Sequence, residues 1–176
     1  MKSIDRRSAA KRTAFLTLFL IGIISGASTF KADFSGTWTF DPLKSNLPES
    51  GMMAPIKMTI TQEKNAIVIQ RIWRNQQNEN IAMTDNIPFD GKETSGTGFA
   101  NSTRRSSMAW ESGDTFRIKM TVQGTFEGKA FHVGIAEKWT LSSDRNTLTI
   151  DRESNGSRGL IITKHAYNRE TMLSRK

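Results

Sequence analysis

Glu137 is an acidic residue at a position where the sequence pattern predicts an apolar face. It alternates with Ile135 and Trp139, so in a β-strand it shares a face with two apolar side chains. A buried carboxylate needs a partner, because an unpaired buried charge is costly. Three arginines could supply that partner: Arg74, Arg104 and Arg105. The pattern leaves two interpretations open: a β-bulge near Ala136 that turns Glu137 outward, or a polar anchor inside a ligand pocket.

Tryptophan side chains are large enough either to line such a pocket or to fill the core of a small barrel. Trp110 has the same parity as Arg104 and Met108, so an indole and a guanidinium are expected to face the same space. The predicted ligand-binding residues are Trp73, Arg74, Arg104, Trp110, Glu137 and Trp139. Periodicity leaves open whether the interior is hollow or filled.

Residues for metal binding or covalent catalysis are scarce. The two histidines, His132 and His165, belong to different predicted strands, and a metal site needs several convergent ligands. His132 is expected to face solvent. The sequence has no cysteine and no Gly-x-Ser-x-Gly motif, and the glycine-rich Ser95–Gly98 stretch has no phosphate-loop lysine. We therefore expect no metal, no cofactor and no catalytic residues, and an enzyme is the least favoured class.

Alternating segments must position these side chains. In the first, residues 33–40, Phe34, Gly36 and Trp38 share one face of a strand. Similar segments continue to residue 167, separated by turn signals at intervals of roughly 8–12 residues. The prediction is an all-β fold, an antiparallel up-and-down meander of about 8–10 strands that closes into a barrel. Residues 41–51 form a loop, either a lid or strap over a barrel end or a plain surface excursion.

The first 27 residues have the three-part pattern of a secretory signal peptide: a basic start, an apolar run and small residues. Cleavage is expected after Ala27, with Ala32 as the second choice. The predicted location is periplasmic or extracellular, with no integral membrane domain after cleavage; the alternative is an uncleaved anchor. The leader holds five of the 25 basic and one of the 17 acidic residues, which leaves 20 minus 16, or +4. That charge gives no reason to expect nucleic-acid binding.

The stretch Phe34-Ser35-Gly36-Thr37-Trp38 resembles the Gly-x-Trp opening strand of lipocalins and their fatty-acid-binding relatives. Lys138–Asp144 and Thr147–Ile150 resemble the late hairpins of small exported bacterial lipocalin-like proteins without assigned activity. The resemblance implies a barrel domain over residues 33–167 and a tail over 168–176. It also implies that Gly36 and Trp38 are structural and that a late basic residue covers Trp38, with Arg152 as first choice and Lys164 as second.

The sequence thus favours an exported lipocalin-like protein that holds a small, mostly apolar or amphipathic ligand in its barrel. The alternative is an envelope interaction or inhibitor module with a filled barrel and no ligand. Cavity volume separates the two, because a cavity below about 300 Å³ does not hold a drug-sized molecule. The oligomeric state has no signal in the sequence.

Overall fold

The computed structural model describes residues 31–48, 54–75 and 77–171. The predicted signal peptide lies outside these residues. Within them, no helix is long and apolar enough to span a membrane.

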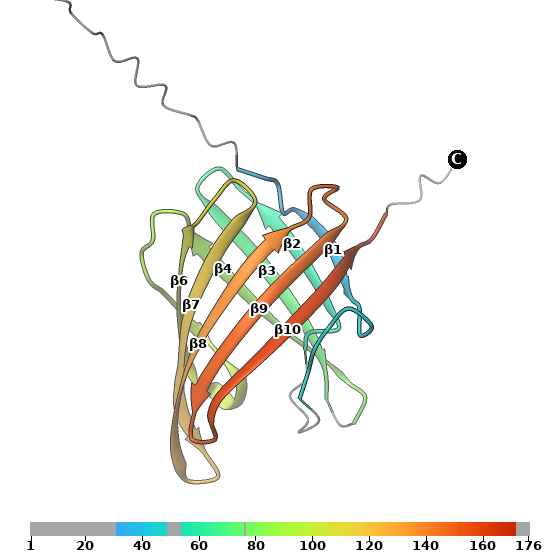
Figure 1. The fold of residues 1–176 in the computed structure, drawn as a ribbon. Coiled ribbons are helices and arrows are strands. Elements are labelled where there is room, and N and C mark those ends of the chain that lie inside the picture. Colours follow the sequence, from blue (N-terminus) through green and yellow to red (C-terminus); the bar gives the residue numbers. More distant parts are fainter. Residues whose placement is uncertain (1–30, 49–53, 76, 172–176) are drawn as a thin grey trace, which may run out of the picture.

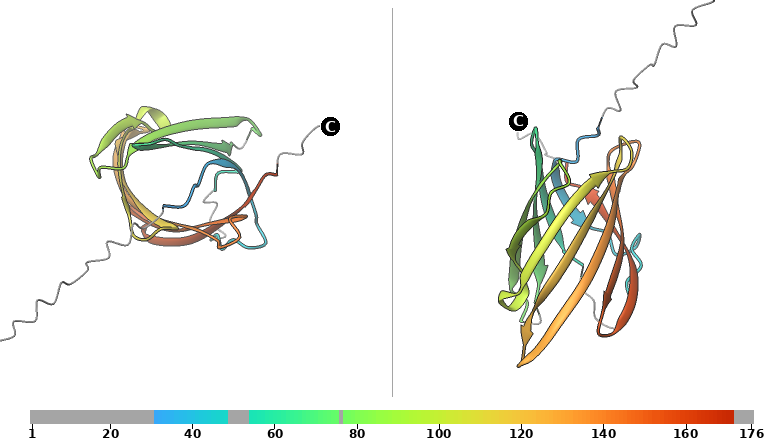
Figure 2. Two further views of the ribbon diagram at one scale, coloured as in Figure 1. Left: turned by 90° about the horizontal axis from the view of Figure 1, so that it is seen from above. Right: turned by 90° about the vertical axis from the view of Figure 1, so that its left-hand side faces the viewer.

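The described chain forms ten antiparallel strands and one short 3₁₀ helix, Phe99–Asn101. The strands are β1 (Gly36–Phe40), β2 (Lys57–Gln62), β3 (Ala66–Arg74), β4 (Asn80–Pro88), β5 (Thr94–Thr97), β6 (Thr103–Trp110), β7 (Thr115–Phe126), β8 (Lys129–Leu141), β9 (Thr147–Gly156) and β10 (Gly159–Arg169). They curl into a nearly closed barrel, which is seen end-on as a ring (Figures 1 and 2). This confirms the predicted all-β meander.

The barrel closes by pairing the first strand with the last. The strand order is β4-β3-β2-β1-β10-β9-β8-β7-β6-β5, so the two borders of the sheet are β4 and β5. Trp38 of β1 lies opposite Arg169 of β10. β10 therefore continues two residues past the predicted domain end at residue 167. The discontinuity lies in the middle of the chain, between two strands that are consecutive in sequence.

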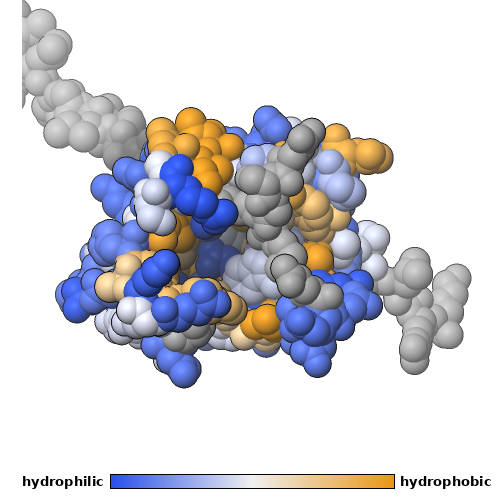
Figure 3. Space-filling view, turned by 90° about the horizontal axis from the view of Figure 1, so that it is seen from below, coloured by the Kyte–Doolittle hydropathy of each residue, from blue (hydrophilic) through white to orange (hydrophobic). Residues whose placement is uncertain are grey.

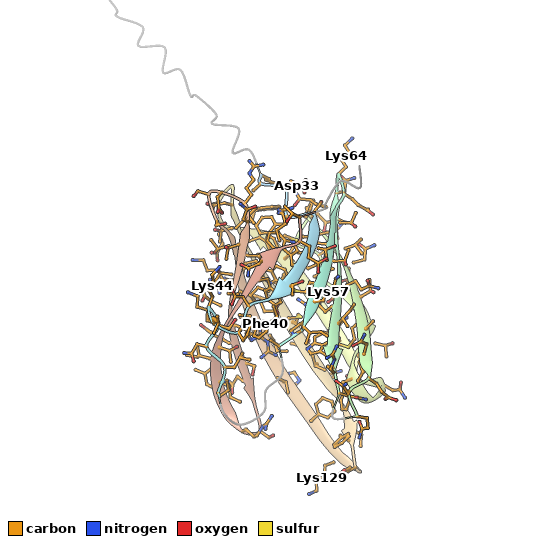
Figure 4. The ribbon with its side chains drawn as sticks, turned by 90° about the vertical axis from the view of Figure 1, so that its right-hand side faces the viewer. Asp33, Phe40, Lys44, Lys57, Lys64 and Lys129 are labelled. Carbon is orange, nitrogen blue, oxygen red and sulfur yellow. The ribbon has the colours of Figure 1, made fainter. Side chains whose placement is uncertain are left out.

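Trp38 is buried in the upper part of the barrel, toward the end that carries Asp33 and Lys64 in Figure 4. Its side chain is 0% exposed, and its indole N–H donates to the carbonyl of Phe34 at 3.0 Å. The guanidinium carbon of Arg169 lies 4.3 Å from its ring centroid. Gly36 has φ +138°, and a Cβ there would lie 2.8 Å from a guanidinium nitrogen of Arg169. Glycine at position 36 thus leaves room for the arginine on the indole.

The prediction that Arg152 or Lys164 covers Trp38 was wrong. Trp38 pairs directly with Arg169, whereas Lys164 is exposed and pairs with Asn46 of the first loop. Arg152 lies farther down β9 and points into the barrel, where it forms an ion pair with Glu137. The last basic residue of β10 is therefore the one that reaches the opening strand.

Aromatic rings fill the upper end of the barrel. We call this group the aromatic cap; it consists of Phe34, Phe89, Trp110, Phe116 and Trp139. Phe116 lies at the centre of the cap, 4.7 Å from Phe34 and stacked at 5.4 Å on Trp139. The ammonium of Lys31 lies 5.1 Å from the Trp110 ring and 5.5 Å from the Phe89 ring. The cap closes this end with packed apolar surface.

The first loop runs beside β10. Asn46 and Lys164 exchange backbone hydrogen bonds at 2.8 and 3.0 Å, and the N–H of Asp41 donates to the carbonyl of Ala166 at 2.8 Å. The described part of the loop therefore lies along the barrel wall beside β10 and does not form the predicted lid or strap over a barrel end. Residues 49–53, which complete the loop, lie outside the described residues.

Candidate functional site

A cavity of about 140 Å³ lies in the barrel below the aromatic cap. Methionine and isoleucine side chains, among them Met58, Met120 and Ile135, supply its apolar wall. Its polar lining comes from six side chains: Arg71, Arg104, Glu137, Arg152, His165 and Tyr167. The lower face of the molecule, which includes the end marked by Lys129 in Figure 4, is hollowed near its centre (Figure 3).

Five charged side chains form a continuous network around this cavity. We call them the charge network; they are Arg71, Asp85, Arg104, Glu137 and Arg152. Arg71 of β3 is the bridge, because one of its terminal nitrogens donates to Asp85 at 2.7 Å and the other to Glu137 at 2.8 Å. Arg104 of β6 adds an ion pair to Asp85 at 2.5 Å. The network therefore links strands on opposite parts of the barrel wall.

Glu137 has the partners that a buried carboxylate requires. Besides Arg71, the indole N–H of Trp139 donates to it at 3.0 Å, and Arg152 lies 3.4 Å away. The guanidinium of Arg71 also lies 5.4 Å from the Trp139 ring centroid. β8 pairs with β7 and β9 in unbroken register through this region, so the alternative of a bulge at Ala136 was wrong.

The charge network holds more positive than negative charge. Among the described residues it contains three guanidiniums and two carboxylates, an excess of one. Burial lowers the pKa of Arg104 and Arg152, because desolvation disfavours their charged form. For Arg71, burial acts in the same direction, but Glu137 and Asp85 outweigh it and raise the pKa. The interior is thus an electropositive site with apolar walls.

Two neutral polar side chains on β10 complete the lining. Burial lowers the pKa of His165 to about 4, so its ring is uncharged at neutral pH. The ring nitrogen Nε2 lies 3.0 Å from the hydroxyl of Thr163. Burial raises the pKa of the Tyr167 phenol. The Tyr167 hydroxyl is buried without a hydrogen-bond partner among the described residues. A buried unsatisfied hydroxyl costs free energy, so this group is suited to a partner that enters the cavity.

A second, more open pocket of about 300 Å³ adjoins the cavity and shares Val122, Ile135 and Arg152 with it. We call it the vestibule. Val133 and Ile161 add apolar surface, and Arg158 lies at its rim. The vestibule follows the lower halves of β8, β9 and β10, so it extends the cavity toward the lower end of the barrel.

Three of the six predicted ligand-binding residues line the cavity: Trp73, Arg104 and Glu137. Trp139 is completely buried, and it donates a hydrogen bond to Glu137 without lining the cavity itself. Trp110 belongs to the aromatic cap instead, 5.4 Å from Phe116. The parity argument correctly placed both Trp110 and Arg104 on the inner face. They lie six residues apart along β6, however, so Trp110 reaches the aromatic cap and Arg104 reaches the cavity.

The assignment of Arg74 to the site was wrong. Arg74 is exposed, because β3 alternates strictly and Ile67, Ile69, Arg71 and Trp73 occupy its inward positions. Arg105 is also exposed and lies 3.8 Å from Glu93 at the surface. The partner of Glu137 that sequence reasoning missed is Arg71, and its shared parity with Ile67 and Ile69 was the available signal.

Asp85, Arg152 and Tyr167 were also missed as site residues. Asp85 lies between Met83 and Ile87 on the inward face of β4, and Arg152 follows Leu148 and Ile150 in phase. His132 is exposed, as predicted, and the described residues contain no group of three side chains suited to hold a metal ion.

No protein-family model and no curated protein sequence matches this chain. Solved structures similar to it include zebrafish ileal bile acid-binding protein in complex with cholic acid, with 12% identity, a TM-score of 0.47, and coverage of 78% of this chain and 98% of that one. A mutant of the fluorescent protein UnaG has 12% identity, a TM-score of 0.46, and coverage of 77% and 95%. The strand order itself shows a ten-stranded antiparallel meander that forms a nearly closed barrel, and its first strand carries the sequence Gly36-Thr37-Trp38.

Proposed function

We propose that this protein is an exported binding protein that holds a small amphipathic anion inside its barrel. The observation that carries the proposal is the excess guanidinium in a cavity whose remaining wall is apolar. Small-molecule sites combine an apolar lining with a few convergent polar groups that orient the ligand. Here the polar groups favour a carboxylate or a similar anion, because arginine binds such groups through paired, charge-assisted hydrogen bonds.

The anionic end of the ligand belongs in the 140 Å³ cavity, near Arg71, Arg152 and the unpartnered hydroxyl of Tyr167. The apolar part belongs in the vestibule, against Val122, Val133 and Ile161. The cavity alone is below the roughly 300 Å³ that a drug-sized molecule needs. A ligand with a compact charged head and a slender apolar tail suits this shape.

Binding of decanoate and decanol, which have the same chain length, tests the proposal. We expect decanoate to bind at least tenfold more tightly by calorimetry, and Arg152→Gln to remove most of that preference. Arg117→Gln is the matched control, since Arg117 pairs with Glu111 at the surface. Equal affinity for acid and alcohol contradicts an anion site. Native mass spectrometry of protein purified from its own host identifies the natural ligand.

A filled-barrel interaction module is the second candidate, and the small volume of the enclosed cavity favours it. The same titration separates the two, because an interaction module binds neither decanoate nor decanol. Co-purification of a small molecule with the native protein contradicts this alternative.

Export is proposed from the three-part pattern of residues 1–27. The N–H of Ala32 donates to the carbonyl of Gly113 at 2.6 Å, and Ala32 is buried in the core. Cleavage after Ala32 removes a core residue, whereas cleavage after Ala27 leaves it in place. We expect the intact mass of the exported protein to correspond to a chain that begins at Ser28.

A further inference from the structure

The barrel has one seam where neighbouring strands lack a backbone ladder. β4 and β5 follow each other in sequence, yet they are the two borders of the sheet and are not hydrogen-bonded to each other. β5 has only four residues, Thr94–Thr97, and pairs with β6 alone among the described strands. Two unpaired strand edges thus face each other across the wall of the barrel.

The side chain of Arg104 spans this seam from the inside. Arg104 of β6 reaches β4, where it forms the 2.5 Å ion pair with Asp85, donates to the carbonyl of Thr84 at 3.3 Å and contacts the sulfur of Met83 at 3.7 Å. The side chains of Arg104 and Asp85 are each 5% exposed. Thr84 belongs to β4, so this hydrogen bond joins Arg104 to the backbone of the border strand.

β5, which follows β6 at the border of the sheet, does not crowd the Arg104 side chain. Gly96 of β5 is directly opposite Arg104 of β6, so a side chain at position 96 would point to the same face as Arg104. Glycine has none, and a Cβ built there meets no atom within 4 Å. A methyl group at position 96 would thus leave Arg104 untouched, and the guanidinium reaches past β5 to its partners on the border strand β4.

We propose that the β4–β5 seam is a lateral entrance to the cavity and that Arg104 is its latch. Arg104 and Met83 both line the cavity, so the seam borders the interior directly. Opening the seam breaks no backbone ladder; it requires the contacts of Arg104 with β4 to part. Asp85 keeps Arg71 as a partner when that happens, which lowers the cost of opening. This inference does not depend on which ligand binds, or on whether one does.

The absence of cysteine allows a direct test with single engineered thiols. Ser106→Cys places a thiol on the inward face of β6, two residues from Arg104, at a position that is 3% exposed. Ser154→Cys is the matched control, because Ser154 is 5% exposed but lines the vestibule on β9. Each thiol is reacted with excess maleimide under native conditions, with Arg104 intact, with Arg104→Gln and with Arg105→Gln.

We expect Arg104→Gln to raise the labelling rate at position 106 at least tenfold and the rate at position 154 less than twofold. Arg105→Gln, which changes an exposed arginine on the same strand, is expected to change neither rate. An unchanged rate at position 106 overturns the latch, and so does an equal rise at both positions, which indicates general loosening. Arg104→Lys is the second variant, for use if Arg104→Gln fails to fold; it retains the charge but loses the guanidinium fork. An intermediate labelling rate at position 106 in this variant supports the proposal. A rate with Arg104→Lys equal to that of the intact chain overturns it.

Discussion

The upper end and the middle of the barrel use the same inward-facing strand positions for opposite purposes. At the upper end, Trp38 and the aromatic cap exclude water and pack ring against ring. In the middle, the same rows of positions carry Arg71, Glu137 and Arg152. Aromatic packing contributes to stability directly, whereas buried ion pairs often contribute little after their desolvation cost. We therefore expect the cap to maintain the barrel, and the proposed function assigns the charge network to binding.

Removal of the indole at the upper end should have the largest effect. Trp38→Ala deletes a completely buried side chain, and we expect the free energy of unfolding in urea to fall by about 3–5 kcal/mol. Trp73→Ala is the comparison, because Trp73 is half-buried at the cavity and should cost less than half as much. A loss below about 1 kcal/mol for Trp38→Ala would show that Trp38 is not part of the core that holds the barrel together.

Acid should weaken the middle of the barrel through His165. Its pKa is lowered to about 4 in the folded protein from the ordinary 6.5, because burial disfavours the charged ring. A lowered folded pKa means that its contribution is complete above pH 6.5 and is lost as the pH falls toward 4. We expect the free energy of unfolding to drop by about 2–3 kcal/mol more between pH 7 and pH 4.5 than in His165→Gln.

His132→Gln, at an exposed position, is the control for that measurement. The expected pH dependence of His132→Gln is that of the unmodified protein. If His165→Gln has the same pH dependence as the unmodified protein, the buried imidazole has no part in the acid response.

Glu137→Gln tests the division of roles at the charge network itself. The change removes one of two carboxylates that face three guanidiniums, so the affinity for decanoate should rise about tenfold, equivalent to about 1.4 kcal/mol. Stability should fall by about 1–3 kcal/mol, because Arg71 and Arg152 lose a charged partner. Calorimetry and urea unfolding measure the two effects separately. Equal affinity in both forms removes Glu137 from the binding site.

Gly36→Ala is expected to have the smallest effect and concerns only the upper end. An added Cβ meets the Arg169 guanidinium and must also adopt φ +138°, which together should cost about 1–2 kcal/mol. Decanoate affinity should not change. A change in affinity without a change in unfolding free energy would mean that the two ends of the barrel are coupled.

Much of the architecture was predictable because strand periodicity alternates strictly with few interruptions. The turn residues and the repeated apolar parity predicted the meander, and Glu137 was identified from its phase alone. Its partner was not identified, because Arg71 and Arg74 differ only in which face of β3 they occupy. The apolar residues Val68 and Ile72 on the outer face obscure that alternation. The Arg169 stack on Trp38 depends on register between the first and last strands, which local pattern does not contain.

The pairing of β1 with β10 has a consequence for how this protein acquires its structure. Residues 38 and 169 must meet, so the ring cannot form until nearly the whole 176-residue polypeptide is available. Such distant contacts are associated with slow folding, and until they form, β1 and β10 each present an open border to other chains. Pairing of β10 with β1 removes these two borders, and a chain truncated before Gly159 should aggregate rather than persist as a smaller barrel.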